Sequence, residues 1–249
     1  MADLSDIAAE RAAEFDTRAW AYDQFRPRYP TATFDAIISS VSRGSVRTAI
    51  DVGCGTGIGA LPLLDRGIDL LGIEPAPQMA AIAEMKFAGR GRCTVTRFED
   101  WEAREPVDLI CSFNSWHWVD PASGLDKAAE TLRSGGCLAL VWTDVVQYGE
   151  PPFDRRLEDV LGAAIPDVFD QVTACVRSVL EDRRFTQKET YRHEFSRDLD
   201  AETFVNVRNT YVRQPDPVVN DAISSLIRRE FDGWVTKIEE AVTFIFEVR

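Results

Sequence analysis

The chain has 249 residues, 45% of them hydrophobic, and a formal net charge of −13 at pH 7. A chain of this length can bury one sizeable core without disulfides or metal ions, so we expect a single domain over residues 1–249. The strong negative charge disfavours proteins that must neutralise many phosphates, which argues against a nucleic-acid partner.

The cysteines and the apolar runs bear on the compartment. The five cysteines are odd in number and scattered, and they form no Cys-x-x-Cys pair and no zinc-ligand spacing with histidine, so we expect buried thiols in a reducing compartment and no metal site. The first thirty residues are charged and lack the apolar core of a signal peptide. No apolar run approaches the roughly 18 residues of a membrane span. We therefore expect a cytoplasmic location. The cysteines are Cys54, Cys93, Cys111, Cys137 and Cys175.

The expected elements begin with helix over residues 5–41, interrupted where Pro27 and Pro30 exclude a regular helix. From residue 46 to 145, short apolar runs alternate with helical segments, a pattern typical of parallel strands joined by crossover helices. This predicts a doubly wound α/β sheet. The expected strands are 46–53, 69–75, 93–98, 107–113 and 136–144, and the expected helices between them are 57–67, 78–87 and 125–136.

After the fifth strand the pattern changes. Residues 150–185 have helical spacing, residues 189–199 alternate like a strand, residues 201–231 read as helix around a turn at 214–217, and residues 241–249 favour a strand. Within the single domain we therefore expect four parts. They are a helical N-terminal lid (1–45), a cofactor-binding core (46–145), a helical insertion or lid (146–185) and C-terminal strands and helices that complete the sheet (186–249).

The most specific motif is D-V-G-C-G-T-G at residues 51–57, where the first expected strand ends. Glycines there let the backbone turn tightly and approach a ligand. With Ala60, the glycines also fit the relaxed dinucleotide fingerprint of NAD and FAD proteins. A pyrophosphate, however, would be repelled by Asp51, two residues before the first glycine. The sulfonium and ammonium groups of S-adenosylmethionine would be attracted, so the charge favours that cofactor.

Two further strand ends carry acidic residues. Glu74 can accept hydrogen bonds from ribose hydroxyls, which fits either cofactor. After the third strand, either Glu99 or Asp100 could accept from an adenine amino group while Phe98 packs on the base; the sequence does not decide which of the two acids faces solvent.

Aromatic residues surround His117 after the fourth strand. Trp116 and Trp118 flank it and are expected to line the cleft. His117 could remove a proton from the acceptor as a general base, or it could fix a loop through hydrogen bonds. His193, the other histidine, reads as an ordinary strand residue.

The ordered motifs D-V-G-C-G-T-G, G-I-E-P, F-E-D-W, S-F-N-S-W-H-W-V-D-P and L-R-S-G-G-C-L-A-L, over roughly residues 15–145, resemble the class I S-adenosylmethionine-dependent methyltransferases. The likeness is to methyltransferase type 11, including trans-aconitate and other small-molecule methyltransferases. It implies a Rossmann-like sheet of seven strands with the last antiparallel, and an N-terminal segment that folds over the cofactor and the substrate mouth. The cofactor-binding residues expected from the motifs and the resemblance are Tyr22, Arg26, Asp51, Gly53, Cys54, Gly55, Gly57, Glu74, Pro75, Met79, Phe98, Glu99 and Asn114. The expected substrate residues are Tyr29, Trp116, His117 and Trp118.

The expected function is methyl transfer from S-adenosylmethionine to a small-molecule acceptor. A carboxylate acceptor needs no base, whereas a hydroxyl, amine or carbon acid could use His117. Arg26 and Arg28 are candidates to pair with an acidic substrate. The alternatives are a nucleic-acid methyltransferase, a methyltransferase-like scaffold without transfer, and an NAD(P)-dependent oxidoreductase. The first lacks its usual Pro-Pro-aromatic motif, because residues 114–117 read Asn-Ser-Trp-His. The acceptor atom and the oligomeric state stay open.

Overall fold

Seven strands form one sheet in the computed structural model, which describes residues 10, 12–42, 46–162 and 169–249. The strand order is β3-β2-β1-β4-β5-β7-β6. Strands β1 to β5 are parallel, and β7 runs antiparallel to both of its neighbours, β5 and β6. This confirms the predicted doubly wound sheet with an antiparallel last strand. The strands are β1 (Thr48–Val52), β2 (Asp69–Glu74), β3 (Arg92–Val95), β4 (Val107–Phe113), β5 (Leu132–Gln147), β6 (Phe185–Asp200) and β7 (Trp234–Val248).

Both faces of the central strands are buried, which explains their continuous apolar runs. Along β4, Leu109 and Cys111 belong to one hydrophobic cluster and Ile110 to another on the opposite face. The helices α3 (Thr31–Ser39), α4 (Leu61–Leu64) and α5 (Pro77–Phe87) supply residues to the first cluster. The helices α6 (Pro121–Thr131) and α8 (Phe169–Glu181) supply residues to the second. The sheet is therefore the middle layer of three.

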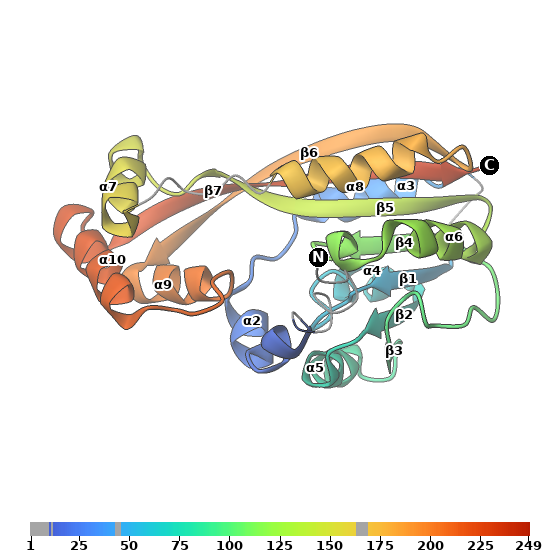
Figure 1. Ribbon diagram of the computed structural model, residues 1–249, viewed down its shortest axis with the longest axis horizontal. Helices are drawn as coiled ribbons and strands as arrows, with labels where there is room; N and C mark the ends of the chain where they lie inside the picture. Colours follow the sequence, from blue (N-terminus) through green and yellow to red (C-terminus); the bar gives the residue numbers. More distant parts are fainter. Residues whose placement is uncertain (1–9, 11, 43–45, 163–168) are drawn as a thin grey trace.

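A second group of helices lies at the far end of the long strands (Figure 1). It comprises α7 (Pro151–Leu161), α9 (Ala201–Asn209) and α10 (Pro217–Glu230), which share an apolar cluster with the ends of β6 and β7. We call this group the helical lobe. The helices predicted between residues 150 and 185 therefore pack in different places, because α7 belongs to the helical lobe whereas α8 packs against the sheet.

The N-terminal segment lies between these two parts. Residues 12–16 are helical, and α2 (Ala19–Phe25) contacts both α5 and α9 (Figure 1). Pro27 and Pro30 separate α2 from α3, as predicted. Residues 5–9 and 11 of the predicted N-terminal helix lie outside the described residues. Within the described ranges, no helix combines the length and apolar character needed to cross a bilayer.

Several predicted elements differ in extent from the structure. The helix expected over 125–136 ends at Thr131, and residues 132–136 already belong to β5. Two further differences lie at the carboxyl edge of the sheet. The helix expected over 57–67 is reduced to the single turn of α4, because Gly57 has a φ of +80° and so cannot continue a right-handed helix. The third strand ends at Val95, which leaves Phe98 in a turn rather than in the strand. Both changes leave more irregular chain at the carboxyl edge of the sheet.

Candidate active site

A cavity of about 650 Å³ lies where the carboxyl ends of β1, β2, β4 and β5 face α2 and the segment after α9. Ligands bind at this edge in doubly wound sheets, and the volume is typical of a small-molecule site. The predicted cofactor residues on its wall are Tyr22, Arg26, Gly53, Gly55, Glu74, Pro75, Met79, Phe98, Glu99 and Asn114. Of the predicted substrate residues, His117 and Trp118 line it.

The glycine loop needs its glycines for close contacts. Gly53 has a φ of +65°, and a Cβ there would lie 2.5 Å from the Cβ of Ser115. At Gly57 a Cβ would lie 2.8 Å from the ring of Phe87 on α5. Gly57 therefore serves the packing of the loop on α5 and does not line the cavity. Cys54 is buried and borders only a small adjoining cavity.

Glu74 joins the glycine loop to the end of β2. Its Oε2 accepts the amide N–H of Gly55 at 2.8 Å, and its Oε1 accepts that of Ala76 at 2.9 Å. Burial raises the pKa of Glu74 to about 7, although both backbone hydrogen bonds act to lower it. Each carboxylate oxygen keeps a further lone pair with which it can accept from a ligand hydroxyl.

Asp51 lies behind the cavity wall rather than on it. Its side chain is fully buried, and neither carboxylate oxygen has a hydrogen-bond partner among the described residues. Burial, followed by the charge of Glu74, raises the pKa of Asp51 well above its usual value. The prediction that Asp51 faces the cofactor directly is thus not met in this structure. The site nevertheless contains two buried carboxylates that a nearby cation would stabilise.

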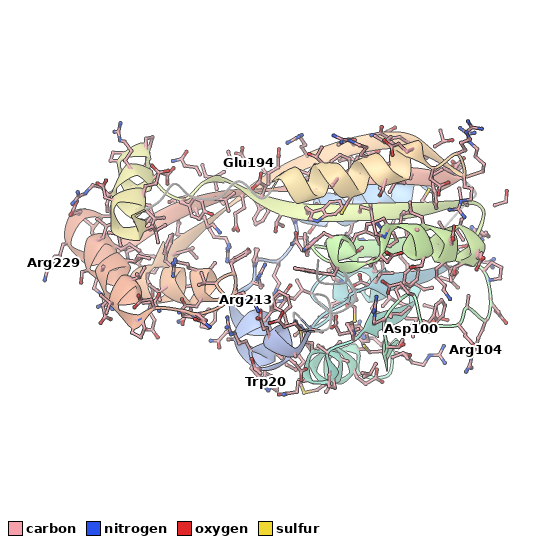
Figure 2. All side chains as sticks on the ribbon, in the orientation of Figure 1. Trp20, Asp100, Arg104, Glu194, Arg213 and Arg229 are labelled. Atoms are coloured by element: carbon pink, nitrogen blue, oxygen red, sulfur yellow. The ribbon has the colours of Figure 1, made fainter. Side chains whose placement is uncertain are left out.

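The structure shows which residue of the other acidic pair, Glu99 or Asp100, faces the cavity. Glu99 lines the cavity, pairs with Arg97 at 3.0 Å and accepts the amide N–H of Asp120 at 2.9 Å. Asp100 is exposed and lies on the outside of the molecule, near β3 (Figure 2). Glu99 is therefore the acid that a ligand in the cavity would meet.

Aromatic packing fixes Phe98 on the cavity wall. Its ring is stacked on Trp101, with centroids 6.5 Å apart and an interplanar angle of 15°, and lies 6.0 Å from the Trp116 ring. Trp116 is only 2% exposed and belongs to the core. The expectation that Trp116 lines the cleft is therefore wrong, because the side chain supports Phe98 from below the wall.

Carboxylates hold the N-terminal segment to the sheet side of the cavity. Asp16 accepts the amide N–H groups of Gln78, at 2.5 Å, and Met79, at 3.4 Å, at the start of α5. Asp23 accepts the hydroxyl of Thr56 at 2.7 Å and pairs with Lys86. Each ties the N-terminal segment to a part of the cofactor-binding core.

Arginines hold the same segment to the helical lobe. Arg18 donates to the carbonyls of Val212, at 2.5 Å, and Asn209, at 3.3 Å. From the lobe side, Arg213 pairs with Glu14 and lies between α9 and the N-terminal segment (Figure 2). The N-terminal segment thus bridges the sheet and the lobe over the cavity.

Arg26 is fixed between two tyrosines. Its guanidinium carbon lies 3.5 Å from the ring centroid of Tyr211 and 4.7 Å from that of Tyr22, and it donates to the carbonyl of Thr210 at 2.9 Å. Arg28, by contrast, is paired with Asp23 and is not on the cavity wall. Of the two arginines expected to meet an acidic substrate, only Arg26 is in position to do so.

Asn114 organises the end of β4. The residue has a φ of +55°, and its side-chain amide donates to the Tyr29 hydroxyl and to Thr143 Oγ1, both at 2.8 Å. Tyr29 borders the small adjoining cavity, of about 20 Å³, rather than the main one. A space of that size holds about one water molecule. Tyr29 is therefore a neighbour of the main cavity and supports its wall through Asn114.

The sequence analysis missed cavity residues on β5 and around the end of α9. Trp142 lines the wall and donates from Nε1 to Nδ1 of His117 at 3.2 Å. Asn206, Tyr211 and Arg213 line the side that the helical lobe provides. The position of Trp142 near the carboxyl end of the fifth expected strand was a usable signal, whereas nothing in the sequence placed residues 206–215 beside the sheet.

The comparisons with known proteins agree with this geometry. The family model described as a methyltransferase domain matches residues 50–140. An uncharacterized methyltransferase of Mycobacterium tuberculosis is 30% identical over 165 residues, or 66% of this chain and 65% of the relative. The match thus spans less than two thirds of the length of that relative.

Solved structures share the fold. A candidate type II methyltransferase from Anaeromyxobacter dehalogenans has a TM-score of 0.67 at 18% identity, covering 90% of this chain and 98% of its own. The geranyl diphosphate C-methyltransferase of Streptomyces coelicolor, in complex with geranyl diphosphate and S-adenosyl-L-homocysteine, has a TM-score of 0.51 at 14% identity, covering 88% and 79%. The family model thus identifies residues 50–140 as a methyltransferase domain, and the relatives, the strand order and the solved structures make the chain similar in sequence and fold to the class I S-adenosylmethionine-dependent methyltransferases.

Proposed function

We propose that this chain transfers the methyl group of S-adenosylmethionine to a small-molecule acceptor bound in the main cavity. The observation that carries the proposal is the pair of buried carboxylates, Asp51 and Glu74, beside the glycine loop. In the part of the chain that the structure describes, neither carboxylate has an ion-pair partner. A pyrophosphate would be repelled there, whereas a ligand with sulfonium and ammonium groups would be stabilised.

The residues on the sheet side fit the cofactor. Glu74 can accept from the ribose hydroxyls, and Phe98 offers an apolar wall to the adenine with Glu99 beside it. Gly55 leaves room for close approach of the ligand to the backbone, because the nearest side-chain atoms lie 3.5 Å and 4.0 Å from where its Cβ would be. When bound, S-adenosylmethionine supplies an already activated methyl group, so the protein has mainly to position the acceptor and exclude water.

The other side of the cavity fits an acceptor with an apolar body and a few polar groups. Trp118 faces it from the segment after β4, Trp142 from β5 and Val172 from α8, and Tyr211 faces it from the segment after α9. Rings and aliphatic side chains of this kind favour a small apolar molecule over a polynucleotide, and the net charge of −13 points the same way. The Streptomyces coelicolor enzyme, which shares the fold, was solved with geranyl diphosphate, and this supports a small-molecule acceptor.

Calorimetric titration with S-adenosylmethionine, S-adenosylhomocysteine and NADH tests the cofactor. We expect heat from both adenosyl ligands and none from NADH. Glu74→Gln should weaken binding of the adenosyl ligands about tenfold, as loss of a hydrogen bond to a charged group does. The matched control, Glu102→Gln, changes an exposed residue outside the cavity and should leave binding unchanged.

The possible outcomes separate the alternatives. Binding of NADH without binding of the adenosyl ligands would overturn the proposal in favour of an oxidoreductase. If the adenosyl ligands bind, a screen of small acceptors for release of S-adenosylhomocysteine tests turnover. Binding without release across a broad panel would instead support a scaffold that holds the cofactor.

A further inference from the structure

Three tryptophans hold His117 on the cavity wall. The histidine lies in the short helix η1 (Trp116–Trp118), which is anchored by the buried Trp116. The ring of Trp118 packs against the imidazole, with centroids 4.5 Å apart. From β5, Trp142 Nε1 donates to His117 Nδ1 at 3.2 Å. The imidazole is therefore oriented by the ring of Trp118 and by the hydrogen bond from Trp142.

The direction of the Trp142 N–H is set by the sheet. Trp142 is 6% exposed, and its backbone pairs with Val242 in the antiparallel ladder between β5 and β7. Its indole packs edge-on against Phe244, with ring centroids 6.1 Å apart. A side chain fixed in this way cannot turn its N–H away from His117 without repacking the core.

This hydrogen bond determines where His117 carries its proton. An indole nitrogen can only donate, so Nδ1 of His117 must accept through its lone pair. A neutral imidazole has a single N–H, which must then be on Nε2. In a protonated imidazole Nδ1 would also carry a hydrogen, and two N–H donors would then face each other. The contact with Trp142 therefore favours the neutral imidazole over the protonated one.

We propose that Trp142 is a positioning residue that fixes His117 as the neutral Nε2–H tautomer, and that His117 therefore does not act as a general base toward the acceptor. A general base needs a lone pair directed at the proton it removes. The only lone pair of this imidazole is already engaged by Trp142.

The consequence for the substrate rests on the proposed methyl transfer. If His117 removes no proton, the simplest acceptor is one whose nucleophilic atom arrives unprotonated. Its electron pair forms the bond to the methyl carbon as the bond from carbon to sulfur breaks. This selects acceptors that are already nucleophilic when bound, rather than hydroxyls that need a base.

Nitrogen NMR of the whole chain labelled with ¹⁵N-histidine tests the tautomer directly. The chain has two histidines, and a His193→Gln variant assigns their signals. At mildly alkaline pH, where an ordinary histidine is neutral, we expect the His117 Nε2 to resonate as a protonated nitrogen and Nδ1 as an unprotonated one. A proton on Nδ1 in the wild-type chain would overturn the inference, and this measurement needs no substitution near the site.

The role of Trp142 is tested with Trp142→Phe, which keeps an aromatic ring and removes the N–H. The population of the Nδ1–H tautomer should rise severalfold in this variant. Trp101→Phe makes the same chemical change at a partly buried ring away from His117, and should leave the ratio of the tautomers unchanged. An unchanged ratio in Trp142→Phe would show that Trp142 does not set the tautomer.

Titration of the same samples with S-adenosylhomocysteine separates this inference from the proposed function. Binding of that ligand together with an Nδ1–H tautomer would overturn the inference and leave the cofactor assignment intact. An Nε2–H tautomer without ligand binding would overturn the cofactor assignment and leave the role of Trp142 supported.

Discussion

Replacing Glu74 with glutamine should flatten the dependence of stability on pH. The carboxyl group is 6% exposed, and burial raises its pKa from 4.5 to about 7. Because the pKa is raised by folding, the folded chain keeps this proton over a pH range in which the unfolded chain has lost it. The free energy of unfolding should therefore fall as the pH rises from 4.5 to about 7.

The size of the effect follows from the shift. Each tenfold change in proton affinity is worth about 1.4 kcal/mol, so a rise from 4.5 to about 7 corresponds to about 3 kcal/mol. This stability is fully present below pH 4.5 and is lost once the pH exceeds the folded pKa. Glutamine cannot ionise, so the Glu74→Gln variant lacks this contribution to the dependence of the free energy of unfolding on pH. Any destabilisation caused by the amide beside Gly55 and Ala76 would be the same at every pH.

Urea unfolding, followed by tryptophan fluorescence at a series of pH values, measures the effect. The free energy of unfolding of the wild type minus that of Glu74→Gln should decrease by about 3 kcal/mol across the series. For Glu102→Gln, an exposed control, the corresponding difference should stay near zero. A difference for Glu74→Gln that does not vary with pH would refute the argument that burial shifts this carboxyl group.

Two substitutions test the glycine loop and the N-terminal segment. Gly53→Ala should lower the free energy of unfolding in urea by about 3 kcal/mol, because the φ of Gly53 is +65° and the new Cβ would meet Ser115. Gly67→Ala is the control: its φ is +79° but the new Cβ would lie in open space, so the loss should be only about 1 kcal/mol. Equal losses of stability in the two variants would contradict the steric argument. Asp23→Asn removes the ion pair with Lys86 and should weaken S-adenosylhomocysteine binding about tenfold in calorimetry. Asp35 forms an exposed ion pair, so Asp35→Asn is the control for Asp23→Asn. If both variants bind S-adenosylhomocysteine equally well, the ion pair between Asp23 and Lys86 does not contribute to ligand binding.

The sheet and the glycine loop were predictable because both depend on local sequence. Strands buried on both faces must be continuously apolar, and β1, β2, β4 and β5 follow such runs. The glycines at 53, 55 and 57 all have positive φ values. Glycine adopts such values more readily than other residues, so the loop carries a pattern of glycines that can be recognised in the sequence. Glu74 and Phe98 reach the cavity because their segments follow parallel strands to the same edge of the sheet.

The contacts across the cavity could not be predicted in this way. The spacing of Phe153 and Leu157 shows that α7 is amphipathic, but it does not show that the apolar face packs on α9 and α10 rather than on the sheet. Tyr211 lies in the turn that follows α9, where the sequence predicts that the helix continues to residue 214, and only the tertiary fold brings its ring to Arg26. Asp51 is a different case, because the motif predicts its place in the sequence at the end of the first strand. The sequence does not predict that packing buries its side chain behind the cavity wall.

The charges of the N-terminal segment explain how two distant parts of the chain can form one site. Its carboxylates, Asp16 and Asp23, bind amide, hydroxyl and ammonium donors on the sheet side, whereas Arg18 and Arg26 bind backbone carbonyls on the lobe side. Glu14 is the exception, because this carboxylate pairs with Arg213 on the lobe side. Exchanging the two sides would nevertheless set Asp16 and Asp23 against carbonyl acceptors, so these contacts favour one orientation of the segment. The helical lobe can therefore shape the acceptor side while the sheet side keeps its contacts to the cofactor, with the N-terminal segment as the connection between them.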